Sequence, residues 1–234
     1  MQGDQPPRQA QLSLFEELEV RRTQALEMGG PEGIAKQHSL GKLTARERID
    51  LLVDAGTFTE MGLLAGKGSY DAQGVFRSLK PSNAIMGTAE IAERRIVVSA
   101  DDFTIRGGSS ESTVSDKWLY AERYAHQMRL PIVRLVETAG GSVRILEQNQ
   151  STKLPGYSTW PWAQQLAQAP VVGVALGACA GLGAVKVAAS HFSVMVRCMA
   201  QVFAGGPPVV KRGIGEEIDK ESLGGSAVHT RSSG

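Results

Sequence analysis

Residues 171–183 read VVGVALGACAGLG, an apolar run that ends in a cluster of glycines. The part from Val171 to Leu176 has the length and branched side chains of a buried strand, and the glycines after it predict a turn over residues 177–183 that opens a helix. The apolar stretch is shorter than the roughly 20 residues of a membrane span, and Lys186 and His191 follow it. We therefore predict a strand, a glycine-rich turn and a helix within a globular core.

The same order of strand, glycine-rich turn and helix occurs twice upstream. A predicted strand ends at Ala100 and leads through residues 101–109, DDFTIRGGS, to a helix with apolar positions from 118 to 128. Residues 131–136 predict the next strand, and residues 137–142, ETAGGS, the next turn. Such repeated units imply a mostly parallel, layered α/β core with the turns gathered at the carboxyl ends of the strands. A ligand is expected at that edge.

The N-terminal part of the chain shows local signals of a different kind. An amphipathic helix is predicted over about residues 12–28, ended by Gly29, Gly30 and Pro31. Thr44 and Glu47 have the spacing of a capping box that opens a second helix. Further strands are expected at residues 57–61, 84–90, 95–100 and 192–196, the middle two as a hairpin.

Composition favours one compact domain over residues 12–234, preceded by a flexible N-terminus over residues 1–11. The 25 Lys and Arg residues balance 24 Asp and Glu residues without a basic block, so neither nucleic acid nor a membrane is an expected partner. Cys179 and Cys198 are too few and too far apart for a disulfide framework or a structural zinc site, which favours a reducing, cytoplasmic setting.

The three glycine-rich turns are the features that could carry chemistry. Glycine allows the backbone to approach a ligand, and the first N–H groups of a helix lack partners and can stabilise an oxyanion. Losing one such donor typically costs about 3 kcal/mol in the reaction barrier. A single turn, such as Gly107-Gly108, Gly140-Gly141 or Gly181-Leu182-Gly183, is most simply a tight turn, but three on successive units favour a function.

Several further motifs follow one another along the chain: residues 41–48 (GKLTARER), 102–109 (DFTIRGGS), 179–181 (CAG) and 205–217 (GGPPVVKRGIGEE), then 223–225 (LGG) and His229-Thr230. By these motifs, the chain from about Leu12 onward resembles the N-terminal domain of the carboxyltransferase β-subunits of propionyl-CoA carboxylase and related biotin-dependent acyl-CoA carboxylases. The resemblance implies a crotonase-like α/β fold, shared with enoyl-CoA hydratases and Clp proteases.

The resemblance implies transfer of a carboxyl group from carboxybiotin, attached to a partner carrier protein, to the α-carbon of an acyl-CoA. In this family, two backbone N–H groups stabilise the thioester enolate, and they fall on Gly181 and Leu182. No side-chain nucleophile, metal or tightly bound cofactor is expected. The substrate-binding backbone is assigned to the remaining turn residues: Gly107, Gly108, Ala139, Gly140, Gly141 and Gly183.

Two departures from the family pattern concern the second and third turns. Where the family usually has Asp-Ser-Gly-Gly-Ala-Arg, residues 137–142 read ETAGGS, so the arginine is missing. Leu182 stands where the family has a second glycine; it keeps the N–H but is expected to add a side chain beside the acyl group.

The family also implies partners. A biotin carboxylase or biotin carrier subunit delivers the carboxyl group, and a C-terminal domain from a second subunit forms the biotin side of the site. The chain ends at Gly234, about where the family passes into that domain, so we expect a homo-oligomeric assembly and poor activity from this part alone. Apolar surface that lacks its partner should promote self-association.

Other functions remain open at this stage. For a Clp-type protease, the nucleophilic serine would fall on Gly181, which argues against hydrolysis. A crotonase-type hydratase or isomerase would use a carboxylate base; Glu137 and Glu147 are candidates, although a turn residue and a solvated helix residue are simpler interpretations. An inactive CoA-binding or assembly fragment, and a decarboxylase, also fit these motifs, and the acyl group is not specified.

Several single residues have a structural interpretation that we favour. Asp101-Asp102 should cap the turn that follows, and His126 and His191 should be ordinary packed histidines. Charge alone makes four residues candidates for the CoA phosphates: Arg106, Lys153, Lys186 and Lys211. Loop packing is the simplest role for Tyr157, Trp160 and Trp162, which could otherwise receive an adenine.

Overall fold

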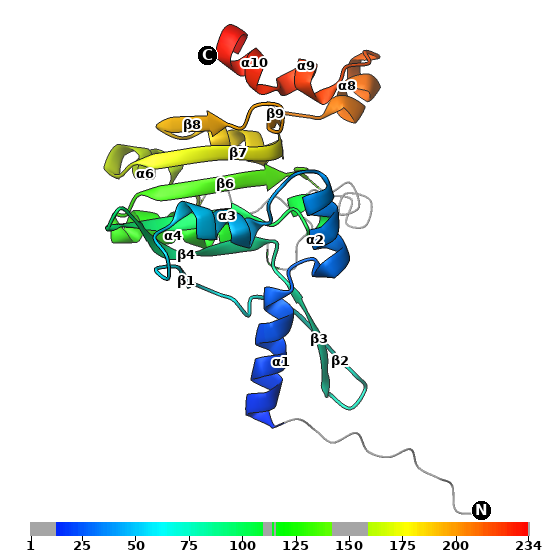
Figure 1. Cartoon of the computed structure of the whole chain (residues 1–234), viewed down its shortest axis with the longest axis vertical. Helices are drawn as coiled ribbons and strands as arrows, with labels where there is room; N and C mark the ends of the chain where they lie inside the picture. The colour runs from blue at the N-terminus through cyan, green and yellow to red at the C-terminus, as the bar shows by residue number, and fades with distance from the viewer. Residues whose placement is uncertain (1–12, 110–113, 115, 142–158, 234) are drawn as a thin grey trace, which may run out of the picture.

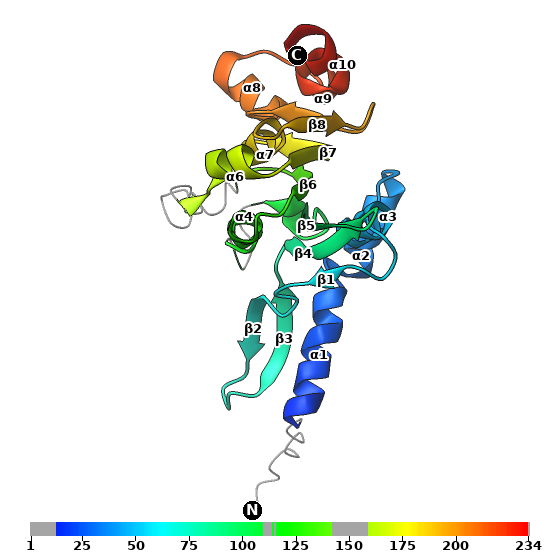
Figure 2. The same cartoon turned by 90° about the vertical axis from the view of Figure 1, so that its left-hand side faces the viewer.

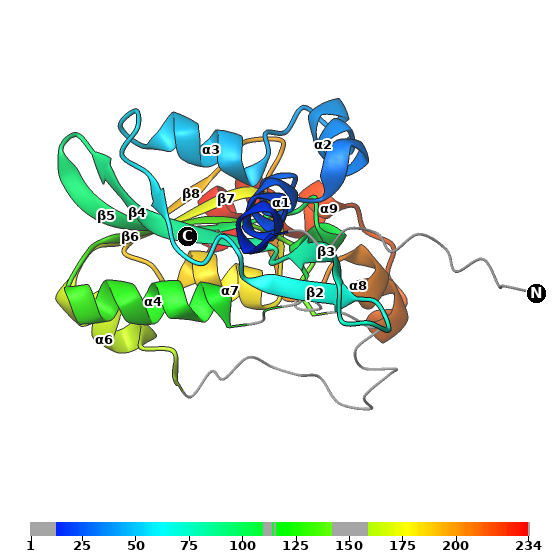
Figure 3. The same cartoon turned by 90° about the horizontal axis from the view of Figure 1, so that it is seen from below.

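The computed structural model describes residues 13–109, 114, 116–141 and 159–233. They form three layers, in which a sheet lies between helices α2 and α3 on one face and α4, α6 and α7 on the other (Figure 3). The helices are α1 (Leu14–Leu26), α2 (Gly30–Ser39), α3 (Ala45–Leu52), α4 (Lys117–Met128), α6 (Trp162–Gln168), α7 (Leu182–Ala188), α8 (Pro207–Ile214), α9 (Lys220–Gly224) and α10 (Ser226–Val228), with helical turns η1 (Arg106–Gly108) and η3 (His229–Ser233).

The main sheet has the order β1-β4-β5-β6-β7-β8, and β9 also pairs with β7. Strands β5 to β9 are joined by parallel pairings, whereas β1 and β4 extend the sheet in antiparallel fashion. The strands are β1 (Thr59–Glu60), β2 (Gly66–Tyr70), β3 (Phe76–Pro81), β4 (Ala84–Ile91), β5 (Arg94–Asp101), β6 (Ile132–Thr138), β7 (Val171–Ala180), β8 (Phe192–Met195) and β9 (Gln201–Phe203). The predicted α/β class and the β4–β5 hairpin are confirmed.

An arm projects from the layered body and consists of α1 and the antiparallel hairpin β2–β3 (Figures 1 and 2). Helix α1 begins at the capping box of Ser13 and Glu16 and packs along β3, where Gln24 Oε1 accepts the Leu79 N–H at 2.7 Å. Sequence analysis identified α1 but missed the hairpin, because residues 66–81 show no clear apolar alternation.

Helix α2 was not predicted from the sequence. The α1 helix ends before Gly29-Gly30-Pro31, as expected, but a new helix begins at Gly30, with Pro31 in its first turn. Proline suits that position, since its fixed φ is helical and its missing N–H would have no partner there. Gly30 takes a φ of 78°, which lets the chain turn between α1 and α2.

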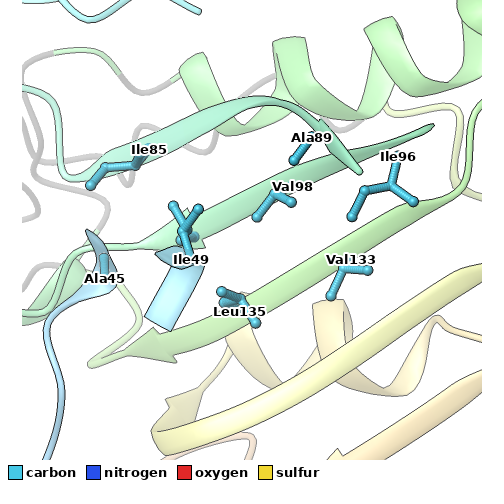
Figure 4. Close-up of a cluster of buried hydrophobic side chains, with 9 residues drawn as sticks. Ala45, Ile49, Ile85, Ala89, Ile96, Val98, Val133 and Leu135 are labelled. Atoms are coloured by element: carbon cyan, nitrogen blue, oxygen red, sulfur yellow. The ribbon is translucent and has the colours of Figure 1, made fainter. Parts of the chain in front are cut away.

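The core on the α3 side joins the predicted capping-box helix to the sheet. Thr44 and Glu47 form the box, and Ala45 and Ile49 then face the strands. Figure 4 shows these side chains among buried residues of β4, β5 and β6. Burying each large aliphatic side chain contributes roughly 1.5–3 kcal/mol, so this packing fixes the segment that carries residues 41–48.

Strand β7 is longer than its sequence suggested. It continues to Ala180, and its last residues, Ala178 to Ala180, pair with β9. Gly177 therefore lies inside a strand. The turn between β7 and α7 is the single residue Gly181, which has a φ of 57°. The glycines of residues 173–183 had indicated an earlier turn; pairing with a distant strand overrode that local signal.

Candidate functional site at the carboxyl ends of β5, β6 and β7

The first two glycine-rich turns are hydrogen-bonded to each other at the carboxyl ends of β5 and β6. The Ala139 N–H donates to the Gly107 carbonyl at 2.8 Å, and Thr138 Oγ1 donates to the Gly108 carbonyl at 2.7 Å. The Gly140 N–H in turn donates to Thr138 Oγ1 at 3.1 Å. Gly107 and Gly108, as predicted for turn glycines, both have positive φ, 64° and 62°.

The third turn lies against the second. A Cβ atom at Gly140 would lie 3.1 Å from the Ala180 carbonyl oxygen, and one at Gly183 would overlap Thr138 Cγ2. Both glycines therefore permit a close approach that any larger residue would prevent. The structure thus brings the three predicted turns together at one edge of the sheet.

The N–H groups of the first and third turns are not equally available to a ligand. Those of Gly107 and Gly108 donate to the carbonyls of Phe103 and Ile105 at 3.1 and 3.0 Å. The Gly181 N–H donates to the Phe203 carbonyl of β9 at 3.1 Å. This differs from the assignment of Gly181 as an oxyanion donor, because its N–H is already used to join β9 to the turn.

Leu182 is placed differently. It is the first residue of α7, and the first intrahelical bond runs from the Val185 N–H to the Gly181 carbonyl. Within the described residues, the N–H groups of Leu182 and Gly183 have no partner, as expected for the first turn of a helix. The exposed Gly141 is also open, since a Cβ there would meet no described atom within 4 Å.

The Leu182 side chain packs against a hydrophobic cluster that contains Trp118 and Trp160. Those two rings meet edge to face, with centroids 5.4 Å apart. The loop-packing role expected of Trp160 is therefore confirmed. Leu182 thus has its side chain half-buried in the core while its N–H remains at the turn.

Glu137 is fully buried in β6, which corrects its interpretation as a turn residue. Its Oε1 accepts from Lys42 Nζ at 2.7 Å, and its Oε2 accepts from Gln37 Nε2 at 2.8 Å and from Arg48. A carboxylate held by two cations and an amide in the core is a poor general base. Lys42 and Arg48 both come from residues 41–48, so the most recognisable motif of the sequence is structural here.

Asp101 and Lys186 form a second buried ion pair, at 2.7 Å, with Lys186 Nζ 4.8 Å from the centroid of the Trp118 ring. Lys186 is therefore not available to CoA phosphates, contrary to the interpretation from charge.

Asp102 caps the following turn as predicted, because its Oδ1 accepts from the Thr104 N–H at 3.0 Å and from the Thr104 hydroxyl at 2.6 Å. Burial raises the Asp102 pKa, although the Thr104 hydrogen bonds and the charges of Arg46 and Arg48 oppose that rise.

Arg134 is a structural residue that sequence reasoning missed. It is buried in the middle of β6 and donates to both carboxylate oxygens of Glu122 in α4, at 2.7 and 2.8 Å. Its Nη1 also donates to the carbonyls of Lys186 and Ala189, at 2.9 and 2.6 Å, which satisfies the end of α7. The signal was present, since an arginine inside the apolar run of residues 131–136 requires a buried partner.

The remaining candidates lie apart from the turns or outside the described residues. Lys211 forms an ion pair with Glu217 at an exposed position on α8. His191 Nδ1 accepts the Val171 N–H at 3.1 Å, which is the structural role expected of this histidine. Trp162 is largely exposed at the start of α6, and Arg106 opens η1 with a φ of 51°. His126 lies near the end of α4. Ser142, Glu147, Lys153 and Tyr157 lie outside the described residues.

Among residues 13–109, 114, 116–141 and 159–233, no group of His, Cys, Asp and Glu side chains is arranged to hold a metal ion. In the same part of the chain, none of the helices is long and apolar enough to cross a membrane.

Comparison with known proteins identifies the family of this chain. Residues 36–234 match the model of the carboxyl transferase domain. The chain belongs to this family. It is 34% identical over 220 residues to the propionyl-CoA carboxylase carboxyltransferase subunit of Haloferax mediterranei, covering 94% of this chain and 42% of that protein. It is also 34% identical over 223 residues to a probable biotin-dependent acyl-coenzyme A carboxylase beta2 subunit of Mycobacterium tuberculosis, covering 94% and 40%.

Solved carboxyltransferases share the fold. The transcarboxylase 12S hexamer with methylmalonyl-coenzyme A and methylmalonic acid bound is similar with a TM-score of 0.77 and 25% identity, over 96% of this chain and 44% of that one. The geranyl-CoA carboxylase β subunit of P. aeruginosa is similar with a TM-score of 0.72 and 25% identity, over 100% and 44%. The expected crotonase-like fold and family resemblance are therefore confirmed. The chain spans about two fifths of the length of the curated relatives it matches.

Proposed function

We propose that this chain forms the acyl-CoA side of a carboxyltransferase site. The reaction moves a carboxyl group from carboxybiotin, carried on a partner protein, to the α-carbon of an acyl-CoA. The observation that carries the proposal is the meeting of three glycine-rich turns at one sheet edge. At the start of α7, the Leu182 N–H has no partner in the part of the chain that the structure describes. Membership of the carboxyl transferase domain family supplies the reaction class.

The chemistry requires a stabilised thioester enolate. When the α-carbon of the acyl group loses its proton, negative charge moves to the thioester oxygen. The N–H of Leu182, which has no partner among the described residues, can donate to that oxygen in place of Gly181. The N–H groups of the adjacent Gly183 and of the exposed Gly141, in the second turn that lies against the third, are further candidates. One such donor is worth about 3 kcal/mol in comparable sites. The enolate carbon then forms its new bond to the carboxyl carbon of carboxybiotin while the bond from that carbon to the biotin nitrogen breaks. The nitrogen keeps the electron pair and takes up the proton that left the α-carbon, so no side-chain nucleophile takes part.

The other half of the reaction belongs to partners. Relatives are named biotin-dependent acyl-CoA carboxylases, and one similar structure is a hexamer. We assign residues 12–234 to the N-terminal carboxyltransferase domain, and the biotin side of the site to a C-terminal domain of a second subunit. Both cysteines are free, which agrees with folding in a reducing compartment such as the cytoplasm.

Two competing functions are less well supported. Protease chemistry of the Clp type needs a nucleophile at position 181, which is glycine. Hydratase or isomerase chemistry needs a free carboxylate, and Glu137 has both carboxylate oxygens occupied by Lys42, Gln37 and Arg48. These contacts favour carboxyl transfer, in which the backbone and not a carboxylate of this chain stabilises the intermediate.

The test is calorimetric titration of the chain with CoA, acetyl-CoA, propionyl-CoA and a longer acyl-CoA. Leu182→Pro removes the proposed donor at the first helical position, where proline is tolerated, and Leu182→Ala trims the side chain but keeps the N–H. Since one neutral hydrogen bond is worth about 1 kcal/mol, the proline variant should bind acyl-CoA roughly fivefold more weakly than the alanine variant. Absence of acyl-CoA binding by the folded wild-type chain would contradict the proposal.

A further inference from the structure

Thr138 lies where the three turns meet, although its place within residues 137–142 had suggested no role for its side chain. Its hydroxyl donates to the Gly108 carbonyl of the first turn at 2.7 Å and accepts the Gly140 N–H of the second turn at 3.1 Å. Its methyl group occupies the space where a Cβ of Gly183 would be, at the start of α7. With 6% of its surface exposed, Thr138 contacts all three turns at once.

The pairing of β6 with β7 becomes irregular just before Thr138 and so changes the direction of its side chain. Up to Val136 the strand pairs in regular register with β7, where Val136 is opposite Ala175. The register then shifts, so that Thr138 is opposite Cys179. An irregularity of this kind changes the direction of a side chain at the end of a strand and is frequent beside active sites. Here the shift places Thr138 against Gly183, the second residue of α7.

We infer that Thr138 is a positioning residue, which sets the start of α7, and with it the Leu182 N–H, relative to the second turn. The inference rests on the proposed function, because it concerns the same donors. Its hydroxyl ties the first turn to the second, and its methyl group sets how closely α7 approaches them. A donor must lie about 2.7–3.1 Å from the developing oxyanion, and a misplacement of about 1 Å can cost 100-fold in rate.

The molecule offers a matched control for the hydroxyl group. Thr57 Oγ1 donates to the Asp54 carbonyl at 2.7 Å and accepts the Glu90 N–H at 3.1 Å. These are the same two kinds of bond, at the same distances, but Glu90 lies at the opposite end of β4 from the turns. Thr57→Val and Thr138→Val therefore each remove one donated and one accepted hydrogen bond. Only Thr138 lies next to the proposed N–H donors.

The experiment compares Thr138→Val, Thr138→Ser and Thr57→Val with the wild-type chain. The readouts are the affinity ratio of propionyl-CoA to CoA by calorimetry and the infrared C=O stretch of bound propionyl-CoA labelled at the thioester carbon. We expect Thr138→Val to lower the ratio about fivefold or more, corresponding to one lost hydrogen bond, and to move the C=O stretch towards its value in free propionyl-CoA. Affinity for CoA should not change.

Thr138→Ser keeps the hydroxyl and should restore much of the infrared shift, whereas Thr57→Val should leave both readouts at the wild-type level. A wild-type ratio and C=O stretch in Thr138→Val would overturn the inference, as would an equal effect of Thr57→Val, which would show a general loss of stability. Urea unfolding of each variant identifies such a loss.

Failure of the proposed function would be seen separately, as no binding of propionyl-CoA by the wild-type chain. In that case, amide hydrogen exchange of Gly140, Gly181 and Val185, whose N–H groups donate to Thr138 Oγ1 and to the Phe203 and Gly181 carbonyls, still tests the role of Thr138 when measured by NMR without ligand. Faster exchange at these three amides in Thr138→Val, but not in Thr57→Val, supports a positioning role. Unchanged exchange rules it out.

Discussion

Glu137 shows how a single buried charge organises the residues around the site. Its carboxylate is fully buried and is held by Gln37 of α2, Lys42 of the following loop and Arg48 of α3. The fold depends on all partners together, because removing one member of a buried ion pair leaves the other charge without compensation.

We predict that Glu137→Gln lowers the free energy of unfolding by roughly 3–5 kcal/mol, since it leaves the two cations without their counter-charge. Urea denaturation followed by circular dichroism measures the change. Glu217→Gln, which breaks only the exposed pair with Lys211, serves as the control and should have little effect. Equal stability of the two variants would show that the Glu137 cluster does not hold the fold together.

Gly177 makes room for the same carboxylate. A Cβ atom at this position would overlap the Glu137 side chain. Gly177→Ala should therefore lower the free energy of unfolding by about 3 kcal/mol or more, because overpacking adds to disruption of the ion pairs. Gly213→Ala, in α8 with nothing within 4 Å of the new Cβ, should leave stability unchanged or raise it by up to about 1 kcal/mol. Thermal or urea unfolding of both variants checks this contrast.

Asp102 gives a prediction about pH. Burial raises its pKa above the ordinary 3.8, so the folded chain holds this proton more tightly than the unfolded chain does. The stability that protonated Asp102 contributes is present below 3.8 and is lost as pH rises through the raised pKa. Asp102→Asn does not titrate, so its stability relative to the wild type should increase across that window.

Urea unfolding of Asp102→Asn and the wild type at a series of pH values measures this difference. Asp219→Asn gives the opposite case, because hydrogen bonds from Ser222 and the backbone hold the Asp219 pKa below its ordinary value. Its relative stability should therefore rise as pH falls. A pH-independent difference for Asp102→Asn would contradict the raised pKa.

At the scale of elements, two capping boxes of the same kind support helices with different importance for the site. Thr44 caps α3, which carries Arg48 to Glu137, whereas Ser13 caps α1 in the projecting arm. Both boxes were detectable in the sequence as patterns, but their consequences depend on what each helix packs against.

We predict that Thr44→Ala lowers the free energy of unfolding of the layered body by about 1 kcal/mol, with a range of roughly 0.5–2. It should also speed amide exchange in α3, because the capping hydrogen bond to the Glu47 N–H is lost. Ser13→Ala should speed exchange in α1 alone. Hydrogen exchange read by mass spectrometry separates the two helices, and identical effects of the two variants on α3 would refute the difference.

At the scale of the whole molecule, the sheet ends in an exposed apolar strand. In the described part of the chain, β8 pairs only with β7, and Phe192 and Val194 are 65% and 37% exposed. An edge strand with apolar side chains is a common site of self-association. The expectation of association through unsatisfied apolar surface therefore points to this edge.

We predict that the purified chain associates in a concentration-dependent way and that Phe192→Lys weakens this association. Sedimentation velocity at several concentrations measures it. Phe15→Lys makes the same change on α1, where Phe15 is 83% exposed, and should leave the association as it is. Equal weakening by both variants would mean that hydrophobicity in general, and not the β8 edge, drives it.

Local signals were enough to predict much of the architecture. The capping box at Thr44, the β4–β5 hairpin and the strand, turn and helix units were visible because each depends on residues close in the chain. Glycine placement also indicated tight turns and close packing, and the structure shows such packing at Gly140, against the Ala180 backbone, and at Gly183, against the Thr138 side chain.

Periodicity, capping and glycine placement are local properties, so the fold class, the family and the edge of the sheet where the turns meet could be predicted from the amino-acid sequence. Three contacts follow only from the folded chain. The Phe203 carbonyl accepts the Gly181 N–H, Lys42 and Arg48 form ion pairs with Glu137, and Thr138 joins the three turns. These contacts join residues that are distant in the chain, such as Arg48 and Glu137, 89 positions apart. Only packing brings such partners together, since no local pattern specifies which distant group a buried polar atom will meet.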